Sequence, residues 1–329
     1  MEVLVESNSL MKAPTSELLS IIQLSKSNSF TIPKWTDGDI SWDRDWAPQR
    51  ITPWFYLPSY QRLPVEIQRR YNQLCSLAIN EMFCLFEEEF LLSVLGTYLL
   101  KPGMDSELRE ALEIFCEEEI KHSEMFWQLS QKAAPQYYPQ RDYFLIKKSQ
   151  QKSAWFFNQV AKSPDFFVFW VWMAIFFEER TLMHSREYLM QARLQPDSLS
   201  PAFFEAHKLH LIEETRHVRL DEHMVDHFYR GSPKYIRTMT GIIMKQMIKN
   251  FASPQRSSVA IAAVLKQEFP QTSVAETLDR IMSELPSLAT CKPYHQAKFG
   301  DHACTRTRKL MGQFPEFKGI WDVLSISRG

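Results

Sequence analysis

Glycine is scarce in this chain, with 9 glycines among 329 residues. The sequence contains no G-x-G-x-x-G, no Walker-type loop and no G-x-S-x-G, so the usual glycine-dependent nucleotide and serine-hydrolase sites are not expected. An excess of basic charge is also missing, because 38 Lys and Arg balance 39 Asp and Glu to a net charge of −1. We therefore expect no nucleic-acid partner, and we interpret the short basic run at residues 306–309 as a solvated helix end.

Cysteine and long apolar runs are sparse as well. The odd number of cysteines and the lack of any C-x-x-C argue against a disulfide framework or a zinc ribbon, and they favour a reducing cytoplasm. The longest apolar run covers residues 166–177, twelve residues, which is too short to cross a bilayer. The N-terminus shows no apolar stretch after a basic start, so no signal peptide is expected. These absences predict a cytoplasmic protein with no membrane partner.

The composition is that of a globular chain, with 45% hydrophobic, 13% aromatic and 23% charged residues. Proline and the spacing of apolar residues divide it into three parts. Residues 1–64 are rich in proline and tryptophan and are predicted to form an arm that wraps the core. Residues 65–230 are predicted to hold four long helices, and residues 231–329 three or four shorter ones that extend the same domain. The long helices are expected at residues 65–100, 105–131, 163–192 and 198–230, with a crossover near 135–150.

Two of the predicted long helices carry the motif Glu-x-x-His, at Glu119–His122 and at Glu214–His217. Residues three apart lie on one face of a helix, so each pair can approach the same metal ion. The other two helices bring carboxylates into apolar surroundings, at residues 87–89 and at residues 178–179. A buried carboxylate is costly unless a cation compensates it. This order of residues is the ligand set of dimetal carboxylate bundles.

A third histidine extends the second motif. His210 precedes Glu214 by four residues and His217 by seven, and the three side chains fall within an arc of about 60° on a helix. They can therefore face one pair of metal ions. The alternative is that these Glu and His side chains lie on solvated helix faces. The chain would then be a metal-free helical scaffold that binds a partner protein.

At these residues the sequence resembles the AurF-like arylamine N-oxygenases, a di-iron family of the ferritin-like superfamily, over roughly residues 65–230. His210, Glu214 and His217 match the His-x-x-x-Glu-x-x-His of that family's last ligand helix, and Glu119 and His122 match its second. The family's first helix carries an Asn-Glu pair that begins seven residues before its ligand Glu, and the pair in this chain, Asn80-Glu81, points to Glu87 as the ligand of the first helix. The resemblance implies an all-α, ferritin-like four-helix bundle with an N-terminal arm and a C-terminal helical extension.

The residues alone do not decide whether Glu178 or Glu179 is the metal ligand of the third helix. The run from Glu179 to Met183 is similar to a Glu-Arg-x-Leu-Met sequence around the equivalent ligand in some ribonucleotide reductase small subunits, which favours Glu179. Glu118 and Glu213 stand where the family often has Asp. The resemblance implies that they, and Glu81, support the ligands by hydrogen bonds. The resulting metal ligands are Glu87, Glu119, His122, Glu179, His210, Glu214 and His217.

The resemblance also implies the chemistry. Two iron ions, with manganese as a possible substitute, would reduce O2 to a bridging peroxo species that oxidises the nitrogen of a small-molecule amine to hydroxylamine or nitro. The sequence has no flavin or nicotinamide motif, so an external electron donor, a ferredoxin or reductase, is expected. The family further implies a homodimer.

Other di-iron chemistry stays open. Hydroxylation at carbon or desaturation would use the same ligands, because the ligands do not choose the substrate atom. A ribonucleotide-reductase-like subunit would carry a radical tyrosine four residues after the first motif's histidine. That position is Phe126 in this chain.

Overall fold

The computed structural model describes residues 15–100, 104–146, 167–252 and 256–324. Over these ranges the chain is built from α-helices joined by short 3-10 turns, and its one β-bridge pairs Asp45 with Leu199. The prediction of an all-α fold is therefore confirmed.

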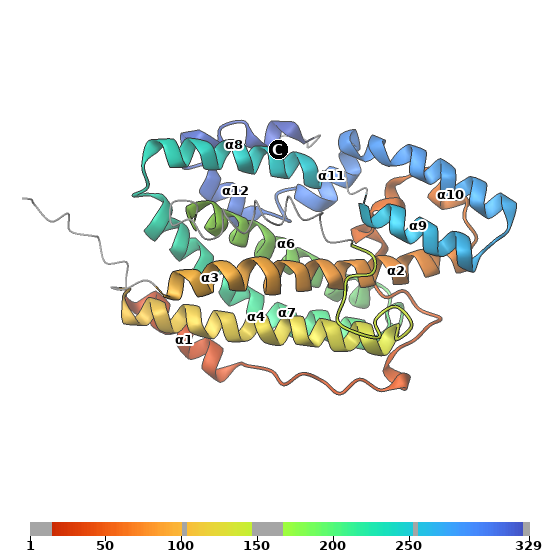
Figure 1. Cartoon of the computed structure of the whole chain (residues 1–329), viewed down its shortest axis with the longest axis horizontal. Helices are drawn as coiled ribbons and strands as arrows, with labels where there is room; N and C mark the ends of the chain where they lie inside the picture. Colours follow the sequence, from red (N-terminus) through yellow and green to blue (C-terminus); the bar gives the residue numbers. More distant parts are fainter. Residues whose placement is uncertain (1–14, 101–103, 147–166, 253–255, 325–329) are drawn as a thin grey trace, which may run out of the picture.

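Four long helical rods run side by side along the length of the molecule (Figure 1). The first rod is continuous through α2, a π-helical segment and α3, and the last rod, α7, continues into a second π-helical segment. The order of rods, with a long connection between the second and the third, is that of ferritin-like bundles. The rods are α2 (Val65–Cys84) with Leu85–Leu91 and α3 (Leu92–Leu99), α4 (Ser106–Ala133), α6 (Phe167–Leu194), and α7 (Pro201–Met224) with Val225–Tyr229.

Local sequence signals account for where the rods begin. The Asp105 carboxylate caps α4 by accepting hydrogen bonds from the amides of Glu107 and Leu108 at 2.9 and 3.4 Å. Pro201 occupies the first turn of α7, where its missing N–H costs nothing. The rods lie where the sequence places them to within a few residues. The start expected near residue 163 and the end of the crossover lie outside the described residues.

The π-helical segment Leu85–Leu91 is a feature that the apolar periodicity of the first rod does not predict. A π turn inserts extra backbone into an α-helix, and such insertions are frequent at functional sites. Glu87 lies inside this segment, and its side chain is buried. The insertion therefore sets the direction in which Glu87 enters the bundle.

The N-terminal arm is partly helical. Helix α1 (Thr15–Ser27) packs against α4 and α7, on the outer side of the bundle (Figure 1). Further along the arm, Trp46 and Trp54 are fully buried and anchor it, as the sequence suggests, whereas Trp42 is half exposed. The Asn72 side chain holds the arm at Ala47, because its Oδ1 accepts from the Ala47 amide at 3.0 Å and its Nδ2 donates to the Ala47 carbonyl at 2.6 Å.

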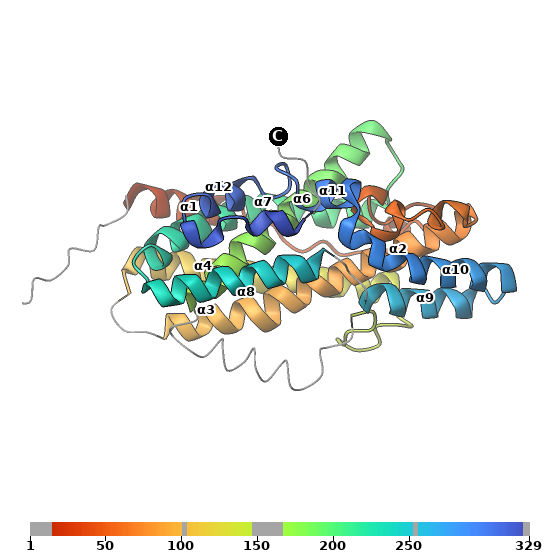
Figure 2. The same ribbon diagram turned by 90° about the horizontal axis from the view of Figure 1, so that it is seen from above.

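The C-terminal part adds five α-helices to the described chain, one or two more than expected (Figure 2). The shortest two have 8 and 7 residues, too few to show a periodic apolar pattern. Helices α8 and α12 pack on α6, while α9 packs on α2. Among the described helices, none is long and apolar enough for a membrane span. The five helices are α8 (Lys234–Phe251), α9 (Arg256–Glu268), α10 (Thr272–Glu284), α11 (Lys292–Phe299) and α12 (Thr305–Met311).

Candidate metal centre

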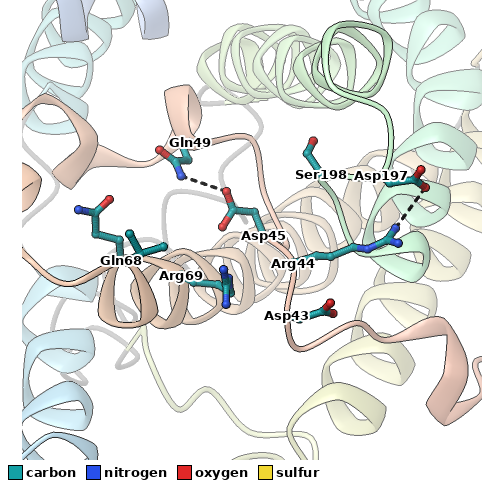
Figure 3. A pocket seen from close by; sticks show the side chains of 9 residues that line it. Asp43, Arg44, Asp45, Gln49, Gln68, Arg69, Asp197 and Ser198 are labelled. Carbon is teal, nitrogen blue, oxygen red and sulfur yellow. Dashed lines mark hydrogen bonds and ion pairs between the residues drawn. The ribbon is translucent and has the colours of Figure 1, made fainter.

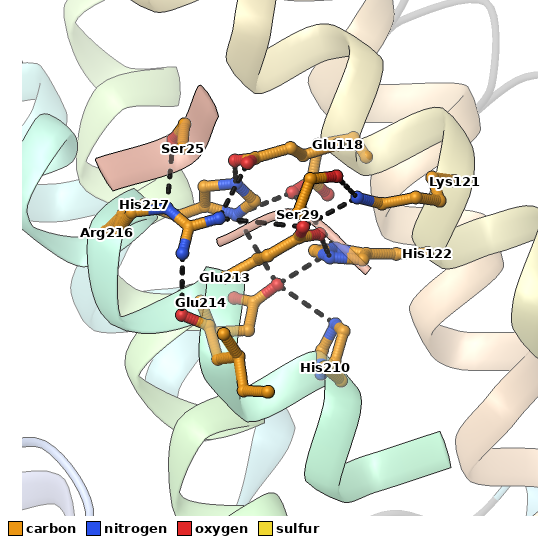
Figure 4. Close-up of polar contacts among 12 residues, drawn as sticks. Ser25, Ser29, Glu118, Lys121, His122, His210, Glu213, Glu214, Arg216 and His217 are labelled. Carbon is orange, nitrogen blue, oxygen red and sulfur yellow. Dashed lines mark hydrogen bonds and ion pairs between the residues drawn. The ribbon is translucent and has the colours of Figure 1, made fainter. Parts of the chain in front are cut away.

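Carboxylates and imidazoles from the four rods meet inside the bundle, and Figure 4 shows those of α4 and α7. His217 Nδ1 lies 2.8 Å from Glu119 Oε1, and His122 Nδ1 lies 3.2 Å from Glu214 Oε1. The Glu214 carboxylate is central to the cluster. Two overlapping groups share it, and within each group the potential ligand atoms lie within 4.8 Å of one another. The groups are Glu87, His122, His210, Glu214 and Glu119, His122, Glu214, His217.

The third histidine is part of this cluster. His210 Nε2 lies 2.9 Å from Glu214 Oε1 and 3.5 Å from Glu87 Oε1, and the ring is fully buried. Its register with Glu214 and His217, read from the sequence, therefore places all three side chains on the inner face of α7. The scaffold alternative requires these groups to lie on a solvated surface, whereas the structure buries them.

Several buried atoms of the cluster form no hydrogen bond with the described residues, although they lie close to one another. Both oxygens of Glu119 and both ring nitrogens of His210 are without one, and so are single atoms of four further cluster side chains. Leaving such atoms unsatisfied in the interior costs several kcal/mol in total, on the order of 1–3 kcal/mol each. Cations between them would remove this cost, and imidazole and carboxylate ligands without thiolate suit iron or manganese. The residues therefore fit a pair of metal ions. The four single atoms belong to His122, Glu178, Glu214 and His217.

The pKa shifts of the cluster residues also indicate that the cluster needs compensating positive charge. Burial alone would lower the pKa of His217, but the charges of Glu119 and Glu214 outweigh it and raise that pKa well above its usual value. Burial, reinforced by Glu214 and Glu119, raises the pKa of Glu178 well above its usual value. Without metal, then, the cluster retains protons to offset its crowded carboxylates, and bound dications would replace those protons.

A reciprocal pair of outer carboxylates orients two of the histidines (Figure 4). His122 Nε2 on α4 donates to Glu213 Oε2 on α7 at 2.9 Å, and His217 Nε2 on α7 donates to Glu118 Oε2 on α4 at 2.8 Å. With Nε2 protonated, the Nδ1 atom of each ring is a free acceptor directed into the cluster. The structure thus gives Glu118 and Glu213 hydrogen bonds of the kind that the resemblance implies.

Each outer carboxylate is also paired with a cation that the sequence analysis did not single out. Lys121 Nζ lies 2.6 Å from Glu213 Oε1, and Arg216 Nη2 lies 2.7 Å from Glu118 Oε1. Both cations directly precede a cluster histidine, so the five-residue pattern Glu-Glu-x-(Lys/Arg)-His occurs twice, from Glu118 and from Glu213. This repeat was the available sequence signal for the two cations.

The structure does not bring Glu179 to the cluster, and this corrects the expectation for the third helix. The Glu179 carboxylate accepts hydrogen bonds from the backbone amides of Arg306 and Thr307, at 2.6 and 2.8 Å, at the start of α12. Glu178 faces inward instead, with Oε2 at 3.7 Å from His217 Nδ1. Adjacent residues on a helix point about 100° apart, so only one of the two can face the bundle axis. The short sequence similarity after Glu179 does not determine that direction.

Of the three carboxylates at residues 87–89, the structure brings Glu87 to the cluster. Ser123 Oγ donates to Glu87 Oε2 at 2.9 Å and fixes that carboxylate, while Glu88 is only partly buried and Glu89 is exposed. Ser123 follows His122 directly and was not identified from the sequence.

Glu81 does not support the cluster, contrary to the prediction. Its carboxylate accepts hydrogen bonds from the Tyr138 hydroxyl at 2.6 Å and from the amides of Phe144, Leu145 and Ile146 at 3.0, 2.9 and 2.6 Å. Burial raises the pKa of Glu81, although these donors oppose the rise. Glu81 therefore holds the segment that leaves α4.

We expect Glu81→Gln to destabilise the fold without affecting the metal content. An amide replaces a charged acceptor of four hydrogen bonds, so the free energy of unfolding should fall by about 2 kcal/mol. Urea denaturation measures this loss, and Glu66→Gln at the exposed start of α2 is the control. Loss of metal from Glu81→Gln would instead restore the supporting role predicted from the sequence.

A separate surface recess lies at the junction of the arm, α2 and the turn before α7 (Figure 3). Arg44 Nη1 and Asp197 Oδ1, 3.4 Å apart, form its ion pair. None of the cluster residues lines it. Its side chains carry both signs of charge and are Asp43, Arg44, Asp45, Gln49, Val65, Gln68, Arg69, Asp197 and Ser198.

The bundle and its buried cluster define a dimetal carboxylate protein of the oxidoreductase class. The chain belongs to the AurF family, described as p-aminobenzoate N-oxygenase AurF, whose model matches residues 18–289. This confirms the family resemblance and extends it into the arm and the C-terminal helices. A search of curated proteins finds no significant match.

Among solved structures, the chain is similar to a tyrosine-to-phenylalanine mutant of an R2-like ligand-binding oxidase with an aerobically reconstituted Mn/Fe cofactor. The two share 15% sequence identity over 100% of each chain, with a TM-score of 0.40.

Proposed function

We propose that this protein is a di-iron N-oxygenase that uses O2 to oxidise the nitrogen of a small-molecule amine, with manganese as a possible substitute metal. The observation that carries the proposal is the third imidazole, His210, directed at Glu87 and Glu214 within a chain of the AurF family. The proposed ligands are Glu87, Glu119, His122, Glu178, His210, Glu214 and His217.

When bound, the metal pair would supply the electrons and the site for dioxygen reduction. The protein's own residues fix the ligands. Thr181 Oγ1 donates to Glu214 Oε2 at 3.0 Å, and Ser123 holds Glu87. Glu118 and Glu213 keep the Nε2 protons of His217 and His122 in place.

Aromatic side chains line one side of the cluster and exclude water from it. The rings of Phe83 and Phe126 lie 5.4 and 5.1 Å from the ring of His210, and Phe126 is fully buried. A phenylalanine at position 126 also offers no phenol next to the cluster. This favours an oxygenase over the radical-bearing subunit considered above.

Further parts of the proposal rest on the family and the sequence. We propose a ferredoxin or a reductase as electron donor, a homodimeric assembly and a cytoplasmic location. Hydroxylation at carbon or desaturation is the second candidate, since the same ligands serve it.

The proposal is tested by metal analysis and by oxidation of an amine panel. We expect close to two iron ions per chain and O2-dependent conversion of one amine class to hydroxylamine or nitro product in single-turnover assays. His210→Ala should reduce that conversion at least tenfold, since removal of one ligand alters one metal position, with helical content unchanged. His302→Ala, which alters an exposed histidine outside the cluster, is the matched control. Metal-free protein, or full N-oxidation by His210→Ala, would contradict the proposal.

A further inference from the structure

Two histidines lie side by side where the fourth rod ends. His223 is in the last turn of α7, and His227 follows it by four residues in the π-helical segment Val225–Tyr229. Their ring centroids are 6.1 Å apart, and the rings are nearly parallel, with 13° between their planes. Residues four apart are neighbours on a helix surface, so both imidazoles can reach one ligand.

The two rings are open to solvent, in contrast to the ligands of the buried cluster. His227 is exposed and His223 is half-buried. His223 follows the proposed ligand His217 by six residues, which turns its side chain about 120° away from the inner face of α7. The pair is therefore separate from the buried cluster, and the proposed function makes no use of it.

The second π-helical segment determines where His227 lies. Insertions of this kind are frequent at functional sites. The first one, at Leu85–Leu91, carries the proposed ligand Glu87, whereas the second one carries His227. The Phe228 ring meets the His227 ring edge-on at 4.6 Å and packs edge-on against Tyr98 of the first rod at 4.8 Å. Packing of the segment against the bundle thus holds the His227 ring beside His223.

Negative charge from three elements surrounds the pair. At this end of the bundle α1 and α4 begin and α7 ends (Figure 1). Three carboxylates here interact electrostatically with His223, and each belongs to a different element. A dication bound to the imidazoles would be stabilised by these charges. The carboxylates are those of Glu17 in α1, Asp105 at the start of α4 and Asp226 in the π-helical segment.

Two arginines compensate only part of this charge. Arg230 Nη2 lies 2.6 Å from Asp226 Oδ1, and Arg219 Nη2 lies 3.6 Å from Glu17 Oε1. Among these side chains, three carboxylates face two guanidinium groups, which leaves one negative charge in excess. The surroundings of the pair therefore favour a cation over an anion.

The protonation of His223 suits metal binding. Burial, followed by the charge of His227, lowers the pKa of His223, although the three carboxylates oppose this. A neutral imidazole keeps a nitrogen lone pair free, and this lone pair is what a metal ion binds.

We propose that His223 and His227 form a surface site for one divalent ion of the late transition metals, such as Zn2+. Imidazole is a preferred ligand of these ions. The exposed His227 side chain can turn so that one nitrogen of each ring lies about 2.0–2.1 Å from the ion, with water as the remaining ligands. Fe2+ binds more weakly than Zn2+ to a given set of ligands, so this site does not add to the two irons expected in the cluster. The inference goes beyond the proposed function and does not depend on it.

Equilibrium dialysis of the full chain against Zn2+, followed by elemental analysis, tests the site. The double variant His223→Ala/His227→Ala should bind one Zn2+ fewer than the wild type, whatever number of ions the buried cluster holds. Each single variant should bind this ion at least tenfold more weakly, measured by competition with a chelator, because it removes one of two ligands. His302→Ala, which alters an exposed histidine elsewhere, is the matched control. Equal Zn2+ content in the wild type and the double variant, or an equal loss in His302→Ala, would overturn the proposal.

Chemical modification of the unaltered protein covers the case in which a variant does not fold. Diethyl pyrocarbonate modifies accessible imidazoles, and mass spectrometry identifies the modified residues. Zn2+ should slow the modification of His223 and His227 at least tenfold and leave that of His302 unchanged, whereas Mg2+, which prefers oxygen ligands, should protect none of them. Modification of the pair at the same rate with and without Zn2+ would contradict the site. Protection of the pair in a protein that oxidises no amine would contradict the proposed function alone.

Discussion

Glu178→Gln should reduce the metal content from about two ions per chain to about one and lower amine oxidation at least a hundredfold. Glu178 is buried beside His217 and Glu214, and its Oε2 has no hydrogen-bond partner in the described chain. An amide is neutral and a poor ligand for hard divalent cations, so one metal position loses a charged donor. Elemental analysis and single-turnover assays measure the two effects.

The adjacent variant Glu179→Gln is the matched control and should behave in the opposite way. It should retain both metal ions and most activity, because its carboxylate contacts the amides of Arg306 and Thr307 rather than the cluster. Its cost is structural, about 1–3 kcal/mol in the free energy of unfolding, because α12 loses a charged hydrogen-bond acceptor. Loss of metal from Glu179→Gln with normal metal in Glu178→Gln would reverse our assignment.

Glu118→Gln should weaken metal binding by about 10- to 100-fold, although Glu118 is not among the proposed ligands. The carboxylate holds His217 through Nε2 and is itself held by Arg216. Burial would raise the pKa of Glu118, but the hydrogen bond and charge of His217, helped by Arg216, lower it to about 2. It is therefore ionised at neutral pH, and its removal takes away the nearer of the two carboxylates of Arg216, since Glu213 Oε1 lies 3.6 Å from Arg216 Nη2.

Competition with a chelator of known affinity measures that loss. Glu117→Gln is the control, because Glu117 precedes Glu118 but is exposed. Glu213→Gln should repeat the effect at His122, since the same arrangement occurs there. Unchanged metal affinity in both variants would show that the histidines are oriented without the outer carboxylates.

Much of the fold followed from the sequence because its signals are local. Proline positions and apolar periodicity predicted the four rods to within a few residues, and the Glu-x-x-His motifs pointed to two of them as bearers of the proposed ligands. The sequence did not predict the π-helical segment at residues 85–91 or the short helices α11 and α12, because they depend on packing between parts far apart in the chain.

For the site as well, local signals could be read from the sequence and long-range packing could not. His210 could be placed because three residues on one helix share a register. Glu178 could not be distinguished from Glu179 in this way, because the difference is a rotation of α6 about its axis, and α12 contributes to fixing that rotation through Glu179.

The crossed pairing of α4 and α7 implies an order of assembly. Each of the two histidines takes its ring orientation from a carboxylate on the opposite helix, so neither can present Nδ1 inward until the helices have docked. Metal capture should accordingly follow association of this helix pair during folding, and the apoprotein should be a compact state ready to be loaded rather than an unfolded chain awaiting metal.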